Sequence, residues 1–137
     1  MNIQDLRIGD HVLYKGEPYK VWSLNGTIAC VEPKHGRVRG VLIEALTPMP
    51  LTFDILTKCG WSHLHDEIRT LPFDFGTLNV VYDKSAGIYI ISVSAKDKAD
   101  TVVLRRVKYI HELQHAMWAL GTEENLKLWQ FGNCSEY

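Results

Sequence analysis

Residues 47–50 read Thr-Pro-Met-Pro, and this short stretch divides the chain into two parts with different patterns. Proline cannot donate a backbone hydrogen bond, and its fixed φ excludes both a helix interior and a central strand. Two prolines separated by one residue therefore predict a linker. We expect residues 1–46 to form one module, residues 51–131 to form a second, and residues 132–137 to form a flexible tail.

The part before the linker has the pattern of short strands between turns. Four strands are predicted, at residues 11–14, 18–24, 27–31 and 37–43. Asn25-Gly26 is the clearest turn, because both residues tolerate positive φ in a tight hairpin. Strands of this length and spacing are typical of a small barrel that closes on itself. The opening Ile-Gly-Asp-His-Val at residues 8–12 resembles SH3-like barrels, so we predict an SH3-like β-barrel.

The part after the linker begins with a predicted helix. Thr52 is a suitable N-cap and Gly60 a suitable C-terminal residue, which leaves a helix of about two turns. The polar segment Ser62–Arg69 has no clear pattern. Three strands of an antiparallel meander follow, at residues 78–82, 88–95 and 101–109.

A change of period marks the C-terminal helix. Its apolar stripe has helical spacing and consists of Ile110, Leu113, Met117 and Leu120. Gly121 ends this helix, and Thr122 begins a second, short one. The fold class is therefore α+β, with an N-terminal barrel followed by a helix, a three-stranded meander and a C-terminal helix.

Composition excludes several classes of protein. The 137 residues carry a net charge of -1 and are 46% hydrophobic, which gives no case for non-specific binding to nucleic acid or membranes. The longest apolar run, Ile88–Val93, is too short to span a bilayer. Cys30, Cys59 and Cys134 make an odd number of cysteines without a C-x-x-C pair, so we expect a reducing, cytoplasmic location.

Residues 111–115 read His-Glu-Leu-Gln-His and match the H-E-x-x-H motif of zinc metalloproteases. Histidines four positions apart project from one face of a helix, so His111 and His115 can bind one Zn²⁺. Glu112 can then act as the base toward a zinc-bound water, whose pKa the metal lowers to about 7. This interpretation predicts a zinc-dependent hydrolase.

Other features of the chain favour an ordinary helix at this motif. A zinc protease needs a third protein ligand, and no histidine follows His115. The carboxylates that follow the motif are Glu123, Glu124 and Glu136, in a turn, at a helix start and beside the C-terminus. His111 and His115 also lie about 100° around the helix from the apolar stripe, where they can border the core.

Two segments of the chain resemble a family of proteins. The first reads Leu-Thr-Phe-Asp-Ile-Leu-Thr-Lys-Cys-Gly-Trp at 51–61, and the second reads Tyr-Ile-His-Glu-Leu-Gln-His-Ala-Met-Trp-Ala-Leu-Gly-Thr-Glu-Glu-Asn-Leu at 109–126. Its members are short uncharacterised proteins of Bacteroidetes and their phages and prophages, and the resemblance spans nearly the whole chain. The family pattern keeps His111, Leu113 and Gln114, but commonly has glutamine in place of Glu112 and asparagine in place of His115. The resemblance therefore implies no zinc site and no assigned activity.

Basic and aromatic residues suggest a further binding surface. Lys34, Arg37 and Arg39 lie in and beside a predicted hairpin loop, and Trp22 lies on a neighbouring strand. Basic loops beside exposed aromatic rings can bind single-stranded nucleic acid. The alternative, which we favour, is a solvated turn. A second basic cluster is formed by Arg105, Arg106 and Lys108, and part of it is the outward face of a strand.

Two further groups of residues have ordinary explanations. His63 and His65 would share one face of a strand and could contribute to a metal site, although surface histidines are the simpler interpretation. The larger aromatic residues are predicted to fill the core: Trp61, Trp118, Trp129, Tyr82 and Tyr89.

Three functions are consistent with these patterns. The first is a non-enzymatic binding module with a phage-related or host protein as its partner, or, with weaker support, nucleic acid. The second is a zinc-dependent hydrolase that uses His111, Glu112 and His115. The third is a structural or assembly role, for example in a phage particle. The absence of a complete catalytic set favours the first function, and no cofactor is expected for it.

Overall fold

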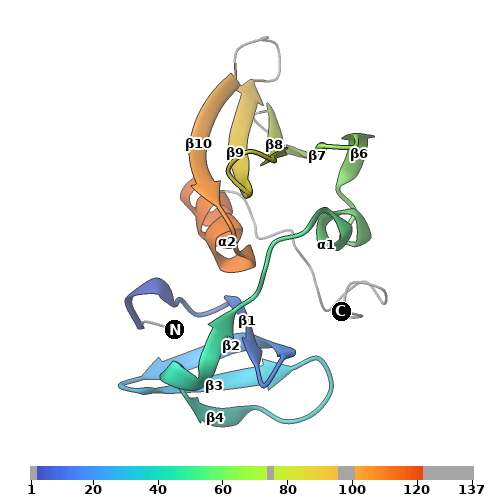
Figure 1. The fold of residues 1–137 in the computed structure, drawn as a ribbon. Helices are drawn as coiled ribbons and strands as arrows, with labels where there is room; N and C mark the ends of the chain where they lie inside the picture. The colour runs from blue at the N-terminus through green and yellow to red at the C-terminus, as the bar shows by residue number, and fades with distance from the viewer. Residues whose placement is uncertain (1–2, 74–75, 96–100, 122–137) are drawn as a thin grey trace. The chain divides into compact units, whose positions relative to one another are not determined.

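The computed structural model describes residues 3–73, 76–95 and 101–121. These residues form two antiparallel five-stranded sheets and two α-helices, so the α+β class is confirmed (Figure 1). Contacts divide the chain into two compact units. The first contains Met1–Pro50 and Tyr109–His111, and the second contains Leu51–Lys108 and Glu112–Tyr137.

The first unit contains the sheet with strand order β4-β3-β2-β1-β5. Its elements in chain order are the 3-10 helix η1 (Ile3–Asp5), β1 (His11–Tyr14), β2 (Glu17–Asn25), β3 (Ile28–Pro33), β4 (Arg39–Leu42), the 3-10 helix η2 (Ile43–Ala45) and β5 (Leu46–Pro48). The predicted hairpin is confirmed, but its turn lies one residue further on, because Asn25 belongs to β2 and pairs with Ile28 across Gly26 and Thr27. The residues of its core alternate along the strands and include Val12, Val21, Ala29, Val31 and Val41.

The predicted closed barrel is not confirmed. Within the described residues the sheet is open, because the outer strands β4 and β5 pair only with β3 and β1 respectively.

The boundary between the two units falls at Pro50, the last residue of the predicted linker at residues 47–50, but Thr47 and Pro48 belong to β5 and pair with Leu13 and Val12. Proline is tolerated there because β5 is an edge strand. Met49, which follows β5, is 1% exposed, and its carbonyl accepts a hydrogen bond of 2.8 Å from the backbone N–H of Ile110.

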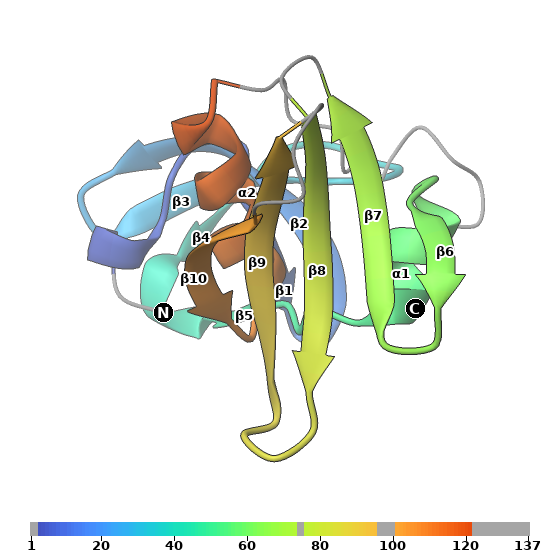
Figure 2. The same cartoon turned by 90° about the horizontal axis from the view of Figure 1, so that it is seen from above.

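The second unit contains the sheet with strand order β10-β9-β8-β7-β6. Its elements in chain order are α1 (Phe53–Lys58), β6 (Ser62–His65), β7 (Ile68–Phe73), β8 (Gly76–Asp83), β9 (Ile88–Ala95) and β10 (Thr101–Val107). The predicted meander is confirmed as β8, β9 and β10, which lie side by side in Figure 2. The polar segment that follows α1 forms β6 and the start of β7, which extend the meander to five strands.

Both predicted helices are present. The Thr52 hydroxyl caps α1 by accepting a hydrogen bond of 3.2 Å from the backbone N–H of Ile55, and Gly60 ends the segment with a φ of 96°. The second helix, α2, spans Ile110–Ala119. Its stripe of Ile110, Leu113 and Met117 is buried as predicted. The second short helix, Trp129 and the tail at 132–137 lie outside the described residues.

Candidate functional site

The two histidines of the H-E-x-x-H motif each lie against an aromatic ring. The imidazole of His111 is buried and stacks on Tyr109, with ring centroids 5.9 Å apart and planes 12° apart. The imidazole of His115 stacks on Trp118, with ring centroids 5.5 Å apart. Both rings therefore have packing partners of their own on or beside α2.

The carboxylate of Glu112 stabilises the start of α2. One oxygen accepts a hydrogen bond of 2.9 Å from the backbone N–H of Lys108, and the other lies 3.5 Å from the Arg105 guanidinium. Lys108 lies two residues before the first residue of α2, and a glutamate in the first turn of a helix can fold back to a backbone N–H at the entry of the helix. The geometry thus gives Glu112 a capping role.

A third zinc ligand is not found in the described part of the chain. Among residues 3–73, 76–95 and 101–121, no group of three or more His, Cys, Asp and Glu side chains is close enough to hold a metal ion. Glu123, Glu124 and Glu136 lie outside these ranges. The register of β6 shifts between His63 and His65, and the side chain of His65 lies outside what the structure describes.

The structure separates the predicted basic and aromatic binding residues. Trp22 is the extra residue of a β-bulge between Val21 and Ser23 and is 61% exposed. Arg39 instead places its guanidinium 5.3 Å from the centre of the Tyr14 ring. Arg39 pairs with Val31, a core residue, so its side chain leaves the sheet on the core side. Lys34 and Arg37 lie in the connection between β3 and β4.

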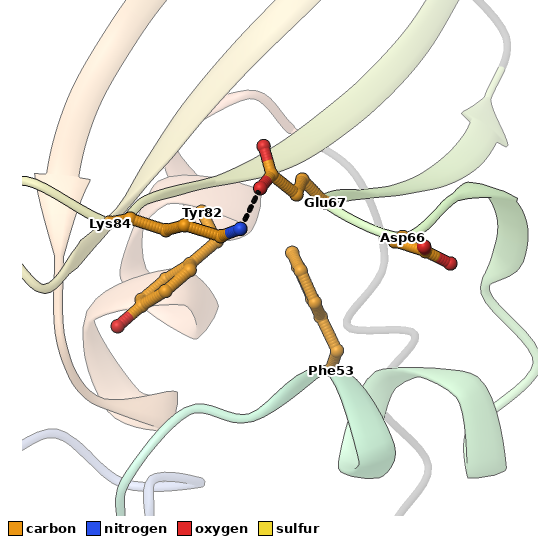
Figure 3. A pocket seen from close by; sticks show the side chains of 5 residues that line it. All are labelled: Phe53, Asp66, Glu67, Tyr82 and Lys84. Atoms are coloured by element: carbon orange, nitrogen blue, oxygen red, sulfur yellow. Dashed lines mark ion pairs between the residues drawn. The ribbon is translucent and has the colours of Figure 1, made fainter.

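An open hollow in the second unit forms a different candidate site (Figure 3). Its volume is about 580 Å³, and it is lined by Phe53, Asp66, Glu67, Tyr82 and Lys84. These residues come from the start of α1, the β6–β7 turn, the end of β8 and the β8–β9 loop. The site therefore depends on the hairpins and the short helix together, and none of its residues was predicted as a binding residue.

An aromatic cluster forms one side of this hollow. Tyr82 and Tyr89 are cross-strand partners with ring centroids 5.0 Å apart, and Phe53 packs edge-on at 5.3 Å from Tyr89 and 6.4 Å from Tyr82. Edge-to-face packing of this kind is favourable because the positive ring edge meets a negative ring face. Burial raises the pKa of the Tyr89 hydroxyl. The cluster is thus a fixed surface rather than a set of independent side chains.

The buried Arg69 supports the cluster from β7. Its guanidinium lies 4.4 Å from the centre of the Phe53 ring. Its Nε donates a hydrogen bond of 2.8 Å to Thr57 Oγ1, and its Nη1 donates one of 3.1 Å to the Ile68 carbonyl. Because the bond to Thr57 joins β7 to α1, Arg69 fixes the position of the Phe53 ring at the hollow.

A lysine of the same chain already contacts the carboxylate side of the hollow. The Lys84 ammonium lies 2.7 Å from a Glu67 carboxylate oxygen, and this contact raises the pKa of Lys84. Figure 3 shows the Lys84 side chain reaching across Tyr82 to Glu67, with Phe53 pointing into the same space and Asp66 pointing away. Both members of the pair are exposed, so the pair contributes little to stability and can exchange its partners.

The prediction that Tyr82 and Tyr89 fill the core is therefore only partly right, because both are half-buried and Tyr82 lines the hollow. A signal was present in the sequence. The two tyrosines lie close to the ends of two consecutive predicted strands, at residues 78–82 and 88–95, and the structure pairs them across the hairpin. Phe53, Glu67 and Lys84 carried no such signal, since a non-local packing of α1 on β7 brings them together.

Comparison of the chain with protein-family models, with curated proteins and with solved structures finds no match. In the described residues, none of the helices has the length and apolar character needed to cross a membrane.

Proposed function

We propose that the chain is a non-enzymatic binding module that recognises a positively charged side chain of a protein partner in the hollow between α1 and β8. One observation carries the proposal: the Lys84 ammonium lies 2.7 Å from a Glu67 carboxylate oxygen, and the Lys84 side chain passes Tyr82 on its way there (Figure 3). A lysine or arginine of a partner would take the place of Lys84. It would pair with Glu67 and contact the faces of Tyr82 and Phe53.

The chemistry of the lining supports a cation in preference to an anion. Aromatic faces attract cations, with about 0.5–1 kcal/mol at exposed sites and about 2 kcal/mol in desolvated ones. Two of the five lining residues, Asp66 and Glu67, are acidic and one is basic. An exposed ion pair adds at most about 1 kcal/mol. Together these terms sum to no more than about 3 kcal/mol, which corresponds to a dissociation constant of roughly 10 mM or weaker for a single side chain.

Three further observations support the kind of partner, the fold of the first unit and the location that belong to this proposal. The resemblance to short proteins of Bacteroidetes and their phages supports a phage-related or host protein as the partner. The SH3-like character of the first unit remains part of this proposal, supported by the short antiparallel strands β1–β5. The free thiol of Cys30 supports a reducing, cytoplasmic location.

A peptide titration tests the proposal. The probe is a capped heptapeptide with one lysine in a Gly-Ser background, and the matched peptide has glutamine in place of lysine. We expect the lysine peptide alone to shift the NMR ring signals of Tyr82 and Tyr89. Glu67→Gln should weaken the response, whereas Glu17→Gln, an exposed carboxylate of the first unit, should leave it unchanged. An equal response to both peptides, or none, overturns the proposal.

A further inference from the structure

The outer strand β10 of the second sheet has an unusual pattern of exposure. In a half-buried strand, alternate side chains face the core. All six residues Thr101–Arg106 are exposed instead. The apolar residues Val102, Val103 and Leu104 are consecutive and are 62%, 58% and 39% exposed. Both faces of this strand therefore present apolar side chains to solvent.

The backbone of β10 is also open on one side. Within the described residues β10 pairs only with β9, which leaves its outer edge with backbone groups for a further strand. Proteins usually protect such edges with charges, proline, bulges or a covering segment, because an apolar edge is a template for pairing. The register shift between Val103 and Arg105 is one such device, but the three apolar residues remain exposed. An exposed apolar edge of this kind is typical of an interaction site.

The charged residues of β10 indicate which kind of partner would fit it. Residues 101–108 contain Arg105, Arg106 and Lys108 and no acidic residue. Arg105 pairs with Ile91 and Arg106 with Ile90, so the two guanidinium groups leave the sheet on opposite faces. Apolar residues thus occupy the first half of β10 and cations the second half. A complementary antiparallel strand therefore has its acidic residues in its N-terminal half, opposite the arginines, and its apolar residues in its C-terminal half, opposite the valines.

We propose that the edge of β10 binds an extended acidic segment of a partner protein, which adds as a sixth antiparallel strand to the second sheet. When a strand is added to a sheet edge, main-chain hydrogen bonds supply affinity that does not depend on sequence, and the side chains supply specificity. Acidic side chains of the partner pair with Arg106 and compete with Glu112, which lies 3.5 Å from the Arg105 guanidinium, for Arg105. Apolar side chains of the partner cover Val102 and Val103. This surface is separate from the hollow and does not depend on its function.

A second copy of this chain fits the same edge less well. In a parallel self-pair, arginines would stand opposite arginines, and like charges in that position are destabilising. In an antiparallel self-pair centred on Leu104, Arg105 and Arg106 would stand opposite the valines of the other copy. Their charges would then gain no acidic partner. Charge complementarity therefore favours an acidic strand over self-association.

Fluorescence anisotropy with a labelled probe peptide tests this proposal. The probe is Thr-Glu-Glu-Thr-Val-Val-Thr, and the matched peptide has lysines in place of the glutamates. We expect the full chain to bind the acidic peptide, with an affinity that falls severalfold when salt rises from low to high concentration. Amide hydrogen exchange should slow at residues 101–107 and not at β4. Equal binding of the two peptides, no binding at low salt, or protection confined to other strands overturns the proposal.

Variants of the edge test the same proposal without disturbing the fold, because the substituted side chains are exposed. Val103→Glu should abolish binding of the acidic peptide at an unchanged unfolding temperature. Leu42→Glu, which alters an exposed apolar residue on the edge strand β4 of the other sheet, should have no effect. Arg106→Glu should reduce binding of the acidic peptide and increase binding of the lysine peptide. If the chain alone self-associates and Val103→Glu abolishes this, the edge serves a second copy and the proposal is wrong.

Discussion

The carboxylate of Glu112 lies 2.9 Å from the backbone nitrogen of Lys108 and accepts its hydrogen bond, so the acid of the H-E-x-x-H motif holds the start of α2. We expect Glu112→Ala to lower the free energy of unfolding by about 1 kcal/mol, as loss of a helix cap does. Glu112→Gln keeps an acceptor oxygen, so its free energy of unfolding should fall by less than that of Glu112→Ala. Urea unfolding of both variants measures this, and equal losses would contradict the capping role.

The stacked rings of His111 and His115 lead to a prediction about metal content. We expect purified protein to contain no stoichiometric zinc by mass spectrometry. His115→Asn should change neither the metal content nor the fold, because His115 is half-buried beside Trp118. One zinc per chain that disappears in His115→Asn would restore the hydrolase hypothesis.

Removal of Lys84 should strengthen binding of a lysine-bearing peptide. Lys84 competes with the ligand for Glu67, and the ion pair that it forms with Glu67 is exposed and therefore weak. Lys84→Met should therefore raise the affinity by about two- to fivefold. Lys58→Met is the control, because it breaks another lysine–carboxylate pair, with Asp54, outside the lining of the hollow. A weaker affinity in Lys84→Met would indicate that Lys84 binds the ligand itself.

The buried Asp10 should make stability depend on pH. Burial raises the pKa of its carboxyl from 3.8 to about 7. The folded state then binds a proton that the unfolded state has released, so this group stabilises the fold below about pH 4 and its contribution is lost as the pH rises to about 7. The stability of the wild type relative to Asp10→Asn should therefore fall over this range, by up to about 1.4 kcal/mol per pH unit.

The neighbouring His11 acts in the opposite direction. Burial, with a contribution from the charge of Lys20, lowers the pKa of its imidazole from 6.5 to about 3. The unfolded state binds the extra proton, so this contribution to stability is present above about pH 6.5 and is lost as the pH falls. Because both variants in the comparison retain His11, the difference between them isolates Asp10. A difference that rises with pH would contradict the assignment.

The buried position of Met49 leads to a prediction for the segment at residues 47–50, which the sequence predicts as a linker. Met49→Ala should cost about 2–5 kcal/mol, because the side chain is fully buried and its removal leaves a cavity. Met49→Leu keeps most of the volume and should cost less than about 1.5 kcal/mol. Thermal unfolding measures both, and a small loss in Met49→Ala would support the linker interpretation.

Local signals predicted the parts of the fold that depend on local geometry. The hairpin, the Thr52 cap and the positive φ of Gly60 are confirmed, although Asn25 itself belongs to β2 and the turn consists of Gly26 and Thr27. The buried stripe of α2 follows from helical spacing alone.

Whether a strand accepts a proline depends on the place of that strand in its sheet, which residues 47–50 do not reveal by themselves. Pro48 is accepted because β5 is an outer strand. Pro72 is accepted in β7, although β7 has a strand on each side, because β6 pairs only with its residues 68–70. The hollow was missed for a related reason. Its lining residues are far apart in the chain, and nothing local distinguishes a core aromatic residue from one at the rim.

The return of Tyr109–His111 to the first unit affects how the chain is made. Met49 accepts a hydrogen bond from Ile110, and Pro50 forms a bridge with Tyr109, both roughly sixty residues later in the chain. On the ribosome, the first fifty residues emerge long before these partners do. The first unit therefore cannot reach its final state during synthesis until most of the second has emerged, and a nascent chain arrested before residue 109 should keep a protease-sensitive segment at Met49 and Pro50.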